Sequence, residues 1–145
     1  MKHSKWLCFS LLAVVALSGC ARAARDTSGF AALDSTTVNA SLEEAWQATK
    51  SVMREMNLDI YTRDKRGAFL AYTDMHRRFR VLTPQRNRLS ITLEEQQGGT
   101  VKITAETMHQ VYGVTLLTYP DWHDRQTTDN QEALAILDAV KAKLS

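Results

Sequence analysis

The sequence has only two cysteines, Cys8 and Cys20, and both lie within its first 20 residues. The rest of the chain therefore has no disulfide and no thiol chemistry. Without disulfides, the folded part must be stabilised by a packed core. The residues from Asp34 to Ser145 are enough for one domain with such a core.

The sequence also lacks a long hydrophobic run. The apolar stretch from Trp6 to Leu17 has about a dozen residues, whereas a membrane-spanning helix needs roughly 20. Lys2 and Lys5 give the chain a positive start before this stretch, and small residues follow it. A positive segment, a short apolar segment and small residues are typical of a secretory signal peptide.

The residues Leu17-Ser18-Gly19-Cys20 resemble the lipobox of bacterial lipoproteins. This resemblance implies that Cys20 is acylated and becomes the first residue of the mature chain. Ala21 in place of Asp then favours the periplasmic face of the outer membrane, if the source is Gram-negative. Acyl chains bind a membrane with about 0.8 kcal/mol per buried CH2 group. The alternative is an ordinary signal peptide that contains a cysteine by chance.

We therefore divide the chain into three parts. Residues 1–19 are expected to be a lipoprotein signal peptide that is removed, and residues 20–33 a flexible tether. Residues 34–145 are expected to be a single domain. Fourteen residues of coil span about 20 Å on average, which is enough to hold the domain away from a membrane.

The chain has little net charge. It carries 18 basic and 16 acidic residues, and loss of Lys2 and Lys5 with the signal peptide leaves 16 of each. A neutral chain is not typical of a general nucleic-acid binder, so we expect no nucleic-acid partner. The expected partners are membrane lipid, through acylated Cys20, and another protein of the envelope.

Catalytic motifs are absent from the sequence. It contains no Gly-x-Ser-x-Gly, no glycine-rich phosphate loop, no Cys-x-x-Cys and no His-Glu-x-x-His. We therefore expect no enzymatic activity, no catalytic residue, no metal and no cofactor. The alternative is a small metal-dependent hydrolase that uses His109, Asp121, His123 and Asp124, because imidazole and carboxylate groups bind zinc.

Two segments have apolar residues at helical spacing. The first begins at Ser41, which is expected to form a capping box with Glu44, and ends near Asn57. The second closes the chain, with an expected capping box between Thr128 and Gln131. Its expected apolar face contains Leu134, Leu137, either Val140 or Lys141, and Leu144.

Between these helices, apolar and polar residues alternate as they do in half-buried strands. Expected turns lie at residues 64–67, 84–87 and 97–99. Six segments are candidate strands: residues 35–39, 58–62, 68–73, 79–83, 88–94 and 101–106. We predict an α+β fold with a single antiparallel sheet of about four to five strands, two helices on one face and the order β-α-β-β-β-β-α.

The phrases VNASLEEAWQATKSVMREMNLDI and DNQEALAILDAVKAKL at the two ends of the domain resemble a family of small bacterial lipoproteins of unknown function. The architecture is also similar to the small domains of BamC-type envelope lipoproteins. These resemblances imply the fold and an envelope location. They imply no catalytic residue.

Two sets of residues are candidates for binding. A cluster of arginines suits an anionic partner, or simply lines turns and the solvated face of the sheet; it contains Arg77, Arg78, Arg80, Arg86 and Arg88. An apolar segment near residues 111–122 is long for a connection and suits a partner or a lipid; it contains Val111, Tyr112, Leu116, Leu117, Tyr119 and Trp122. The alternative for this segment is a further strand over residues 114–118, with Tyr119 and Trp122 covering the edge of the core.

Overall fold

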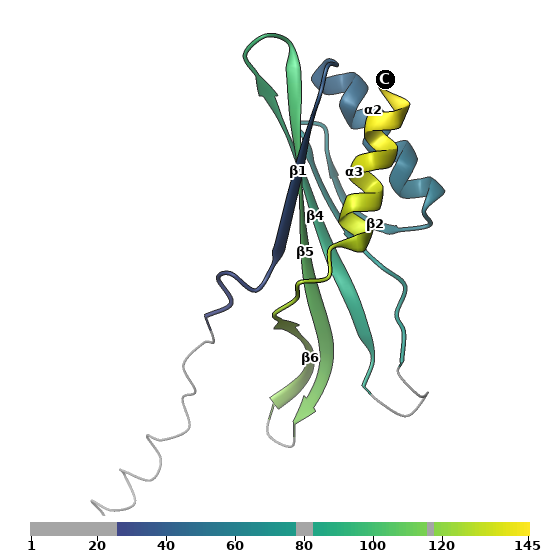
Figure 1. The fold of residues 1–145 in the computed structure, drawn as a ribbon. Coiled ribbons are helices and arrows are strands. Elements are labelled where there is room, and N and C mark those ends of the chain that lie inside the picture. The colour runs from purple at the N-terminus through teal and green to yellow at the C-terminus, as the bar shows by residue number, and fades with distance from the viewer. Residues whose placement is uncertain (1–25, 78–82, 116–117) are drawn as a thin grey trace, which may run out of the picture.

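The computed structural model describes residues 26–77, 83–115 and 118–145 (Figure 1). It shows six strands and two helices in the order β-α-β-β-β-β-β-α. The elements are β1 Ala32–Val38, α2 Leu42–Glu55, β2 Asp59–Asp64, β3 Ala68–Tyr72, β4 Gln85–Gln96, β5 Thr100–Thr115, β6 Thr118–Arg125 and α3 Gln131–Lys143. The predicted α+β class is confirmed, and the sheet has six strands where we expected about four to five.

The start and end of α2 follow from local chemistry. The hydroxyl of Ser41 accepts a hydrogen bond from the Glu44 amide, and the Glu44 carboxylate accepts one from the Ser41 amide at 2.9 Å. This reciprocal pair is the predicted capping box, which satisfies two amides that the helix leaves unpaired. The helix ends before Asn57, whose φ of 56° is incompatible with a further helical turn.

The sheet has the strand order β1-β5-β4-β3-β2, and β6 also pairs with β5. All pairings between neighbouring strands are antiparallel. β5 is 16 residues long, so one edge of it accommodates two strands in succession. β1 pairs with residues 101–107 of β5, and β6 pairs with residues 109–115. The half of β5 that carries β6 extends beyond the two helices (Figure 1).

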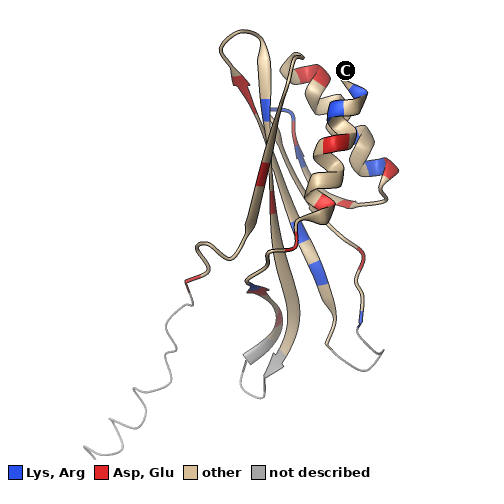
Figure 2. Cartoon of the chain, in the orientation of Figure 1, with Lys and Arg blue, Asp and Glu red and all other residues tan. Residues whose placement is uncertain are grey.

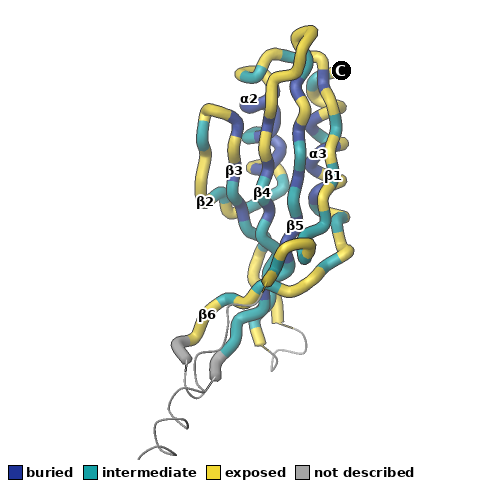
Figure 3. The backbone as a smooth tube through the Cα atoms, turned by 90° about the vertical axis from the view of Figure 1, so that its left-hand side faces the viewer, coloured by how far each residue is buried: buried dark blue, intermediate teal, exposed yellow. Residues whose placement is uncertain are grey.

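Both helices cover the same face of the sheet, as predicted, and the core lies between them and the sheet (Figures 1 and 3). Trp46 of α2 stacks on Phe69 of β3 with ring centroids 5.3 Å apart. The Trp46 Nε1 donates a hydrogen bond to the carbonyl of Asp64. The largest fully buried side chains are Met53, Phe69, Leu89, Ile91, Ile103 and Ile136.

Three predictions about the strands were wrong. β4 begins at Gln85, where we expected a turn, because residues 85–88 pair with residues 108–111 of β5. β5 continues to Thr115 instead of ending near Glu106. Residues 118–122, which we expected to belong to a long connection, are part of β6. Pro120 fits in β6 because this strand pairs only with β5 and forms an edge.

The second predicted capping box does not form. Helix α3 begins after Asn130, whose side chain donates instead to the Asp34 carboxylate at 2.8 Å. The buried face of α3 contains Ala133, Ile136, Leu137 and Val140, whereas Leu134 is 41% exposed. The buried face of α3 therefore begins at Ala133, one residue before the Leu134 that we predicted.

We also predicted a strand over residues 79–83. Residues 79–82 of it lie outside the described residues. The predicted signal peptide at residues 1–19 and Cys20 also lie outside them. Within the described ranges, no helix has the length and apolarity that crossing a membrane requires.

Candidate binding site

The face of the sheet without helices has its own small cluster of buried side chains. Residues alternate between the two faces of a strand, so Ile103, Ala105 and Thr107 face the helices while Met108 and Gln110 face the opposite way. Both helices lie on the other side of the sheet, so neither covers the face that Met108 and Gln110 share (Figure 3). They are nevertheless only 5% and 6% exposed. Other side chains of this face must therefore lie over them.

Arg86 and Arg88 of β4 are two of these covering side chains. They pair across the strands with Gln110 and Met108, and so they share the helix-free face. Figure 2 shows basic residues on the part of β4 that lies beyond the helices. Because Arg86 and Arg88 are two residues apart in one strand, their side chains leave the sheet on the same side.

The guanidinium group of Arg86 lies between two aromatic rings. Its central carbon is 3.9 Å from the ring centroid of Tyr72 and 4.0 Å from that of Trp122. Its Nε donates a hydrogen bond to the Gln110 Oε1 at 3.0 Å. Cation–π contacts of this kind contribute about 0.5–2 kcal/mol each, with the larger values where water is excluded.

A hydrogen-bond chain continues from Gln110 to its neighbours. The Gln110 Nε2 donates to the Asp124 Oδ1 at 2.8 Å, and the Asp124 Oδ2 lies 3.8 Å from the Arg88 Nη1. Hydrogen bonds to both the oxygen and the nitrogen of its side-chain amide therefore hold Gln110 in place. We call this cluster the Arg86 site; it contains Tyr72, Arg86, Arg88, Gln110, Trp122 and Asp124.

The Arg86 site has one positive charge more than it has negative charge, because Asp124 balances only one of the two arginines. Within the described parts of the chain, the two terminal nitrogens of Arg86 have no hydrogen-bond acceptor. A guanidinium with both faces stacked and its Nε bonded has only this terminal edge left for a ligand. Such an edge matches the two oxygens of a carboxylate or phosphate.

Further aromatic contacts flank the Arg86 site. Tyr61 of β2 meets the Tyr72 ring edge-on at 6.2 Å, and Tyr112 of β5 meets the Trp122 ring edge-on at 5.3 Å. The rings and Arg86 thus form a row that runs across the sheet from β2 to β6. Offset and edge-to-face aromatic pairs contribute about 0.5–1.5 kcal/mol beyond their burial.

The structure brings together only part of each predicted binding set. Arg86 and Arg88 lie side by side, whereas Arg77 is exposed in the segment between β3 and β4. Tyr112 and Trp122 are in contact, but Val111 faces the other side of the sheet, opposite His123. Four predicted residues lie entirely outside what the structure describes: Arg78, Arg80, Leu116 and Leu117. The side chain of Tyr119 also lies outside it.

The residues of the alternative hydrolase do not converge. His109 and His123 lie on the helix side of β5 and β6, whereas Asp124 faces the opposite side and bonds Gln110. The Asp121 carboxylate accepts a hydrogen bond from the neighbouring Trp122 amide. In the described ranges, no three histidine, cysteine or acidic side chains are placed to hold a metal ion.

His109 instead joins a network on the helix side. Asn87 donates its Nδ2 to Glu132 of α3 at 2.7 Å, so its Oδ1 faces the His109 Nδ1 at 3.0 Å. The His109 Nδ1 must therefore carry the proton in this contact. Burial lowers the pKa of His109 below its usual 6.5, and nearby His76 lowers it further, while Asp129 opposes them.

We expect the protein to lose stability as the pH falls through about 6.5. In the unfolded chain His109 binds a proton near its usual pKa of 6.5, whereas the folded chain resists protonation because the pKa is lowered. The contribution of His109 to the stability of the fold is therefore complete above pH 6.5 and is lost as the pH falls below it. Thermal unfolding at pH 7.5 and 5.5 should show a smaller decrease for His109→Gln than for the wild type. The exposed His123→Gln is the control, and an equal decrease in all three proteins would contradict the expectation.

Sequence reasoning missed two members of the Arg86 site, Tyr72 and Gln110, and did not connect Asp124 with the arginines. Tyr72 was assigned only to a strand, and Asp124 only to the alternative hydrolase. The missed signal was the continued alternation of Met108, Gln110 and Tyr112, which extends β5 past its predicted end. Once β5 is long, Trp122 and Asp124 can pair with it on the same face.

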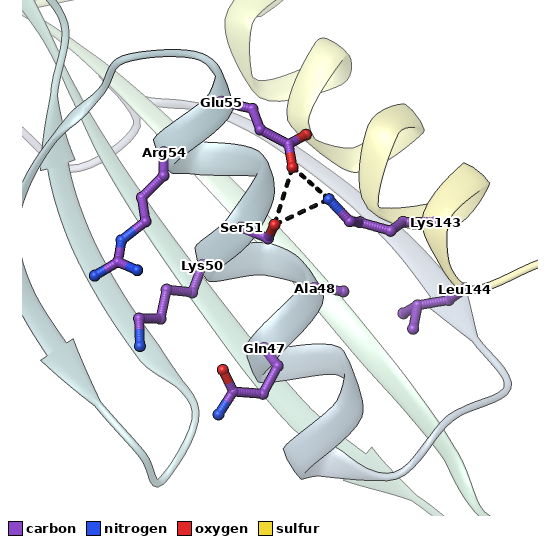
Figure 4. Close-up of a pocket in the computed structure, with 8 residues that line it drawn as sticks. All are labelled: Gln47, Ala48, Lys50, Ser51, Arg54, Glu55, Lys143 and Leu144. Carbon is purple, nitrogen blue, oxygen red and sulfur yellow. Dashed lines mark hydrogen bonds and ion pairs between the residues drawn. The ribbon is translucent and has the colours of Figure 1, made fainter.

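A hollow lies between α2 and the end of α3, with a volume of about 520 Å³ (Figure 4). Lys143 bonds both Glu55, at 2.5 Å, and Ser51, at 2.9 Å, across this hollow. Lys50 and Arg54 point from α2 away from α3 in the same view. Lys143, which bridges the helices, is already paired, so this hollow is a weaker candidate than the Arg86 site.

The chain was compared with protein-family models and with characterised proteins. No family model matches it, and no characterised protein is significantly similar to it.

Proposed function

We propose that this protein is a non-enzymatic binding module of the bacterial envelope, anchored to the periplasmic face of the outer membrane through acylated Cys20. In this proposal the Arg86 site recognises an anionic group on a partner. The anchor rests on the resemblance of Leu17 to Cys20 to a lipobox. The resemblance of the domain to small envelope lipoproteins agrees with it.

The observation that carries the binding function is the fixed guanidinium of Arg86. Stacking on Tyr72 and Trp122 and the bond to Gln110 hold it in place before any ligand arrives. A group that is already ordered loses little side-chain entropy on binding, so more of the interaction free energy appears as affinity. The partly buried surroundings also strengthen its interaction with an anion.

We expect Arg86→Gln to weaken binding to an immobilised phosphate surface such as phosphocellulose by about tenfold, the effect of losing one charge-assisted hydrogen bond. Arg54→Gln removes the same charge from the exposed surface of α2 and should bind more tightly than Arg86→Gln. The measurement is the salt concentration that elutes each variant. Equal elution of the two variants would show that net charge alone governs binding.

The anchor has its own test. Wild-type protein should carry a lipid-sized increase in intact mass and sediment with outer membranes. Cys20→Ala should lack the increase and leave the outer-membrane fraction. A wild type that is soluble and has no added mass would exclude the anchor and leave a soluble α+β domain.

A further inference from the structure

We propose that the Arg86 site docks on the membrane that holds the chain, with the terminal edge of Arg86 on a lipid headgroup phosphate and the rings of Tyr112 and Trp122 at headgroup level. This inference rests on the proposed anchor at Cys20. It names the partner of the Arg86 site as the anionic lipid surface.

The first argument is where the chain enters the domain. The amide of Thr127, just after β6, donates a hydrogen bond to the carbonyl of Phe30, just before β1. Asp26 is also held locally, because its carboxylate accepts a hydrogen bond from the Ser28 amide. The N-terminal segment is thus bound beside the end of β6, and Figure 1 shows both just beyond the helices, where the part of the sheet that carries β6 begins.

The second argument is the distance from this point to the anchor. Cys20 is six residues before Asp26. Six residues reach at most about 20 Å when fully extended. An acylated Cys20 therefore keeps the end of the sheet that carries β6 close to the lipid surface, while the helices lie at the far end.

The third argument is the position of the Arg86 site at that same end. Arg125, two residues before Thr127, pairs with His109, and the neighbouring pair is Asp124 with Gln110. The chain entry is therefore next to the hydrogen-bond chain that fixes Arg86. A tether at this place restricts the domain to orientations in which the Arg86 site is near the headgroups.

The fourth argument is chemical complementarity. The Arg86 site has an excess positive charge and an open guanidinium edge, which suit a phosphate. The neighbouring rings of Tyr112 and Trp122 are amphipathic, and Trp and Tyr are enriched at membrane–water interfaces. An anionic lipid surface attracts a basic side chain with about 1 kcal/mol, which changes the ratio of docked to undocked domain roughly fivefold.

The test uses the mature protein, purified with its anchor and reconstituted in vesicles of phosphatidylcholine alone or with one part in about three of phosphatidylglycerol. The readout is quenching of tryptophan emission by acrylamide in the water. Trp46 is buried and escapes the quencher, so the signal reports the half-buried Trp122. We expect less quenching with the anionic vesicles than with the neutral vesicles.

Arg86→Gln should lower the ratio of docked to undocked domain about fivefold and so remove most of this protection. Arg54→Gln, with the same net charge, should remain protected like the wild type. Inorganic phosphate is added to neutral vesicles as a separate arm. Protection by phosphate alone would overturn the lipid assignment in favour of a site for free phosphate.

The intact mass of the same sample distinguishes a failure of the docking inference from a failure of the proposed anchor. If the protein is acylated but Trp122 is equally accessible in both vesicles, the docking inference is wrong and the anchored module keeps a protein as its partner. If no acyl mass is present, the anchor fails and the docking inference fails with it.

Discussion

Replacing Gly67 by alanine should cost about 3 kcal/mol or more of the free energy of unfolding, because two separate penalties combine at this position. Gly67 has a φ of 109°, a conformation that residues with a side chain rarely adopt. A Cβ there would also collide with the backbone carbonyl oxygen of Leu93. That carbonyl belongs to β4, whose pairing with its neighbours cannot shift easily.

The collision follows from how the turn after β2 is attached to the sheet. The Gly67 amide donates to the Asp64 carbonyl, and the Gly67 carbonyl accepts from the Leu93 amide at 2.7 Å. Gly67 therefore lies directly against β4 and is buried although it belongs to a turn. Relief of the clash would have to move β4 or break this hydrogen bond.

Gly98→Ala is the matched control. Gly98 also has a positive φ, 93°, but a Cβ there would meet nothing within 4 Å. We expect a cost of about 1–2 kcal/mol from the backbone conformation alone. Thermal unfolding should show a decrease of about 10–15 °C for Gly67→Ala and a clearly smaller one for Gly98→Ala. Equal decreases would mean that the contact with Leu93 carries no cost.

The parts of the fold that the sequence predicts well depend on residues close together in the chain. The capping box of Ser41 and Glu44 needs only four consecutive residues, and the stop at Asn57 needs one. The turn at residues 97–99 likewise follows from two adjacent glycines, both with positive φ. In each case the local geometry satisfies its own hydrogen bonds, so distant residues cannot easily override it.

The parts that the sequence predicts poorly depend on distant partners. Residues 84–87 contain proline and asparagine, which favour a turn, yet their pairing with β5 makes all but Pro84 part of a strand. Helix α3 was expected to begin with a cap on Thr128. Contact between Asn130 and Asp34, 96 residues apart, fixes that region instead.

The Arg86 site shows the same limit. Arg86 and Arg88 were predicted to bind an anion, but no local pattern indicates that Arg86 is held between the rings of Tyr72 and Trp122. These rings are 14 and 36 residues away from Arg86 in the sequence. They meet it only because β6 pairs with the far half of β5 and thus returns to the same face.

Replacing Phe69 by alanine should cost about 3–5 kcal/mol, the usual range for a buried aromatic residue. Phe69 is 2% exposed in the middle of β3, and its ring stacks on Trp46. The loss removes apolar burial and leaves a cavity at the contact between α2 and the sheet. Because protein interiors are closely packed, the surrounding side chains can fill only part of that space.

Two controls separate this core contact from a general sensitivity of the sheet to alanine. Tyr61→Ala removes a ring of similar size from the edge strand β2, where it is 76% exposed, and should cost less than about 1 kcal/mol. Phe69→Leu keeps most of the apolar volume and should cost less than Phe69→Ala. The measurement is chemical unfolding with a common slope. If Phe69→Ala cost no more than Tyr61→Ala, the contact between Trp46 and Phe69 could not hold α2 on the sheet, and the attachment of α2 would have to depend on its contacts with α3.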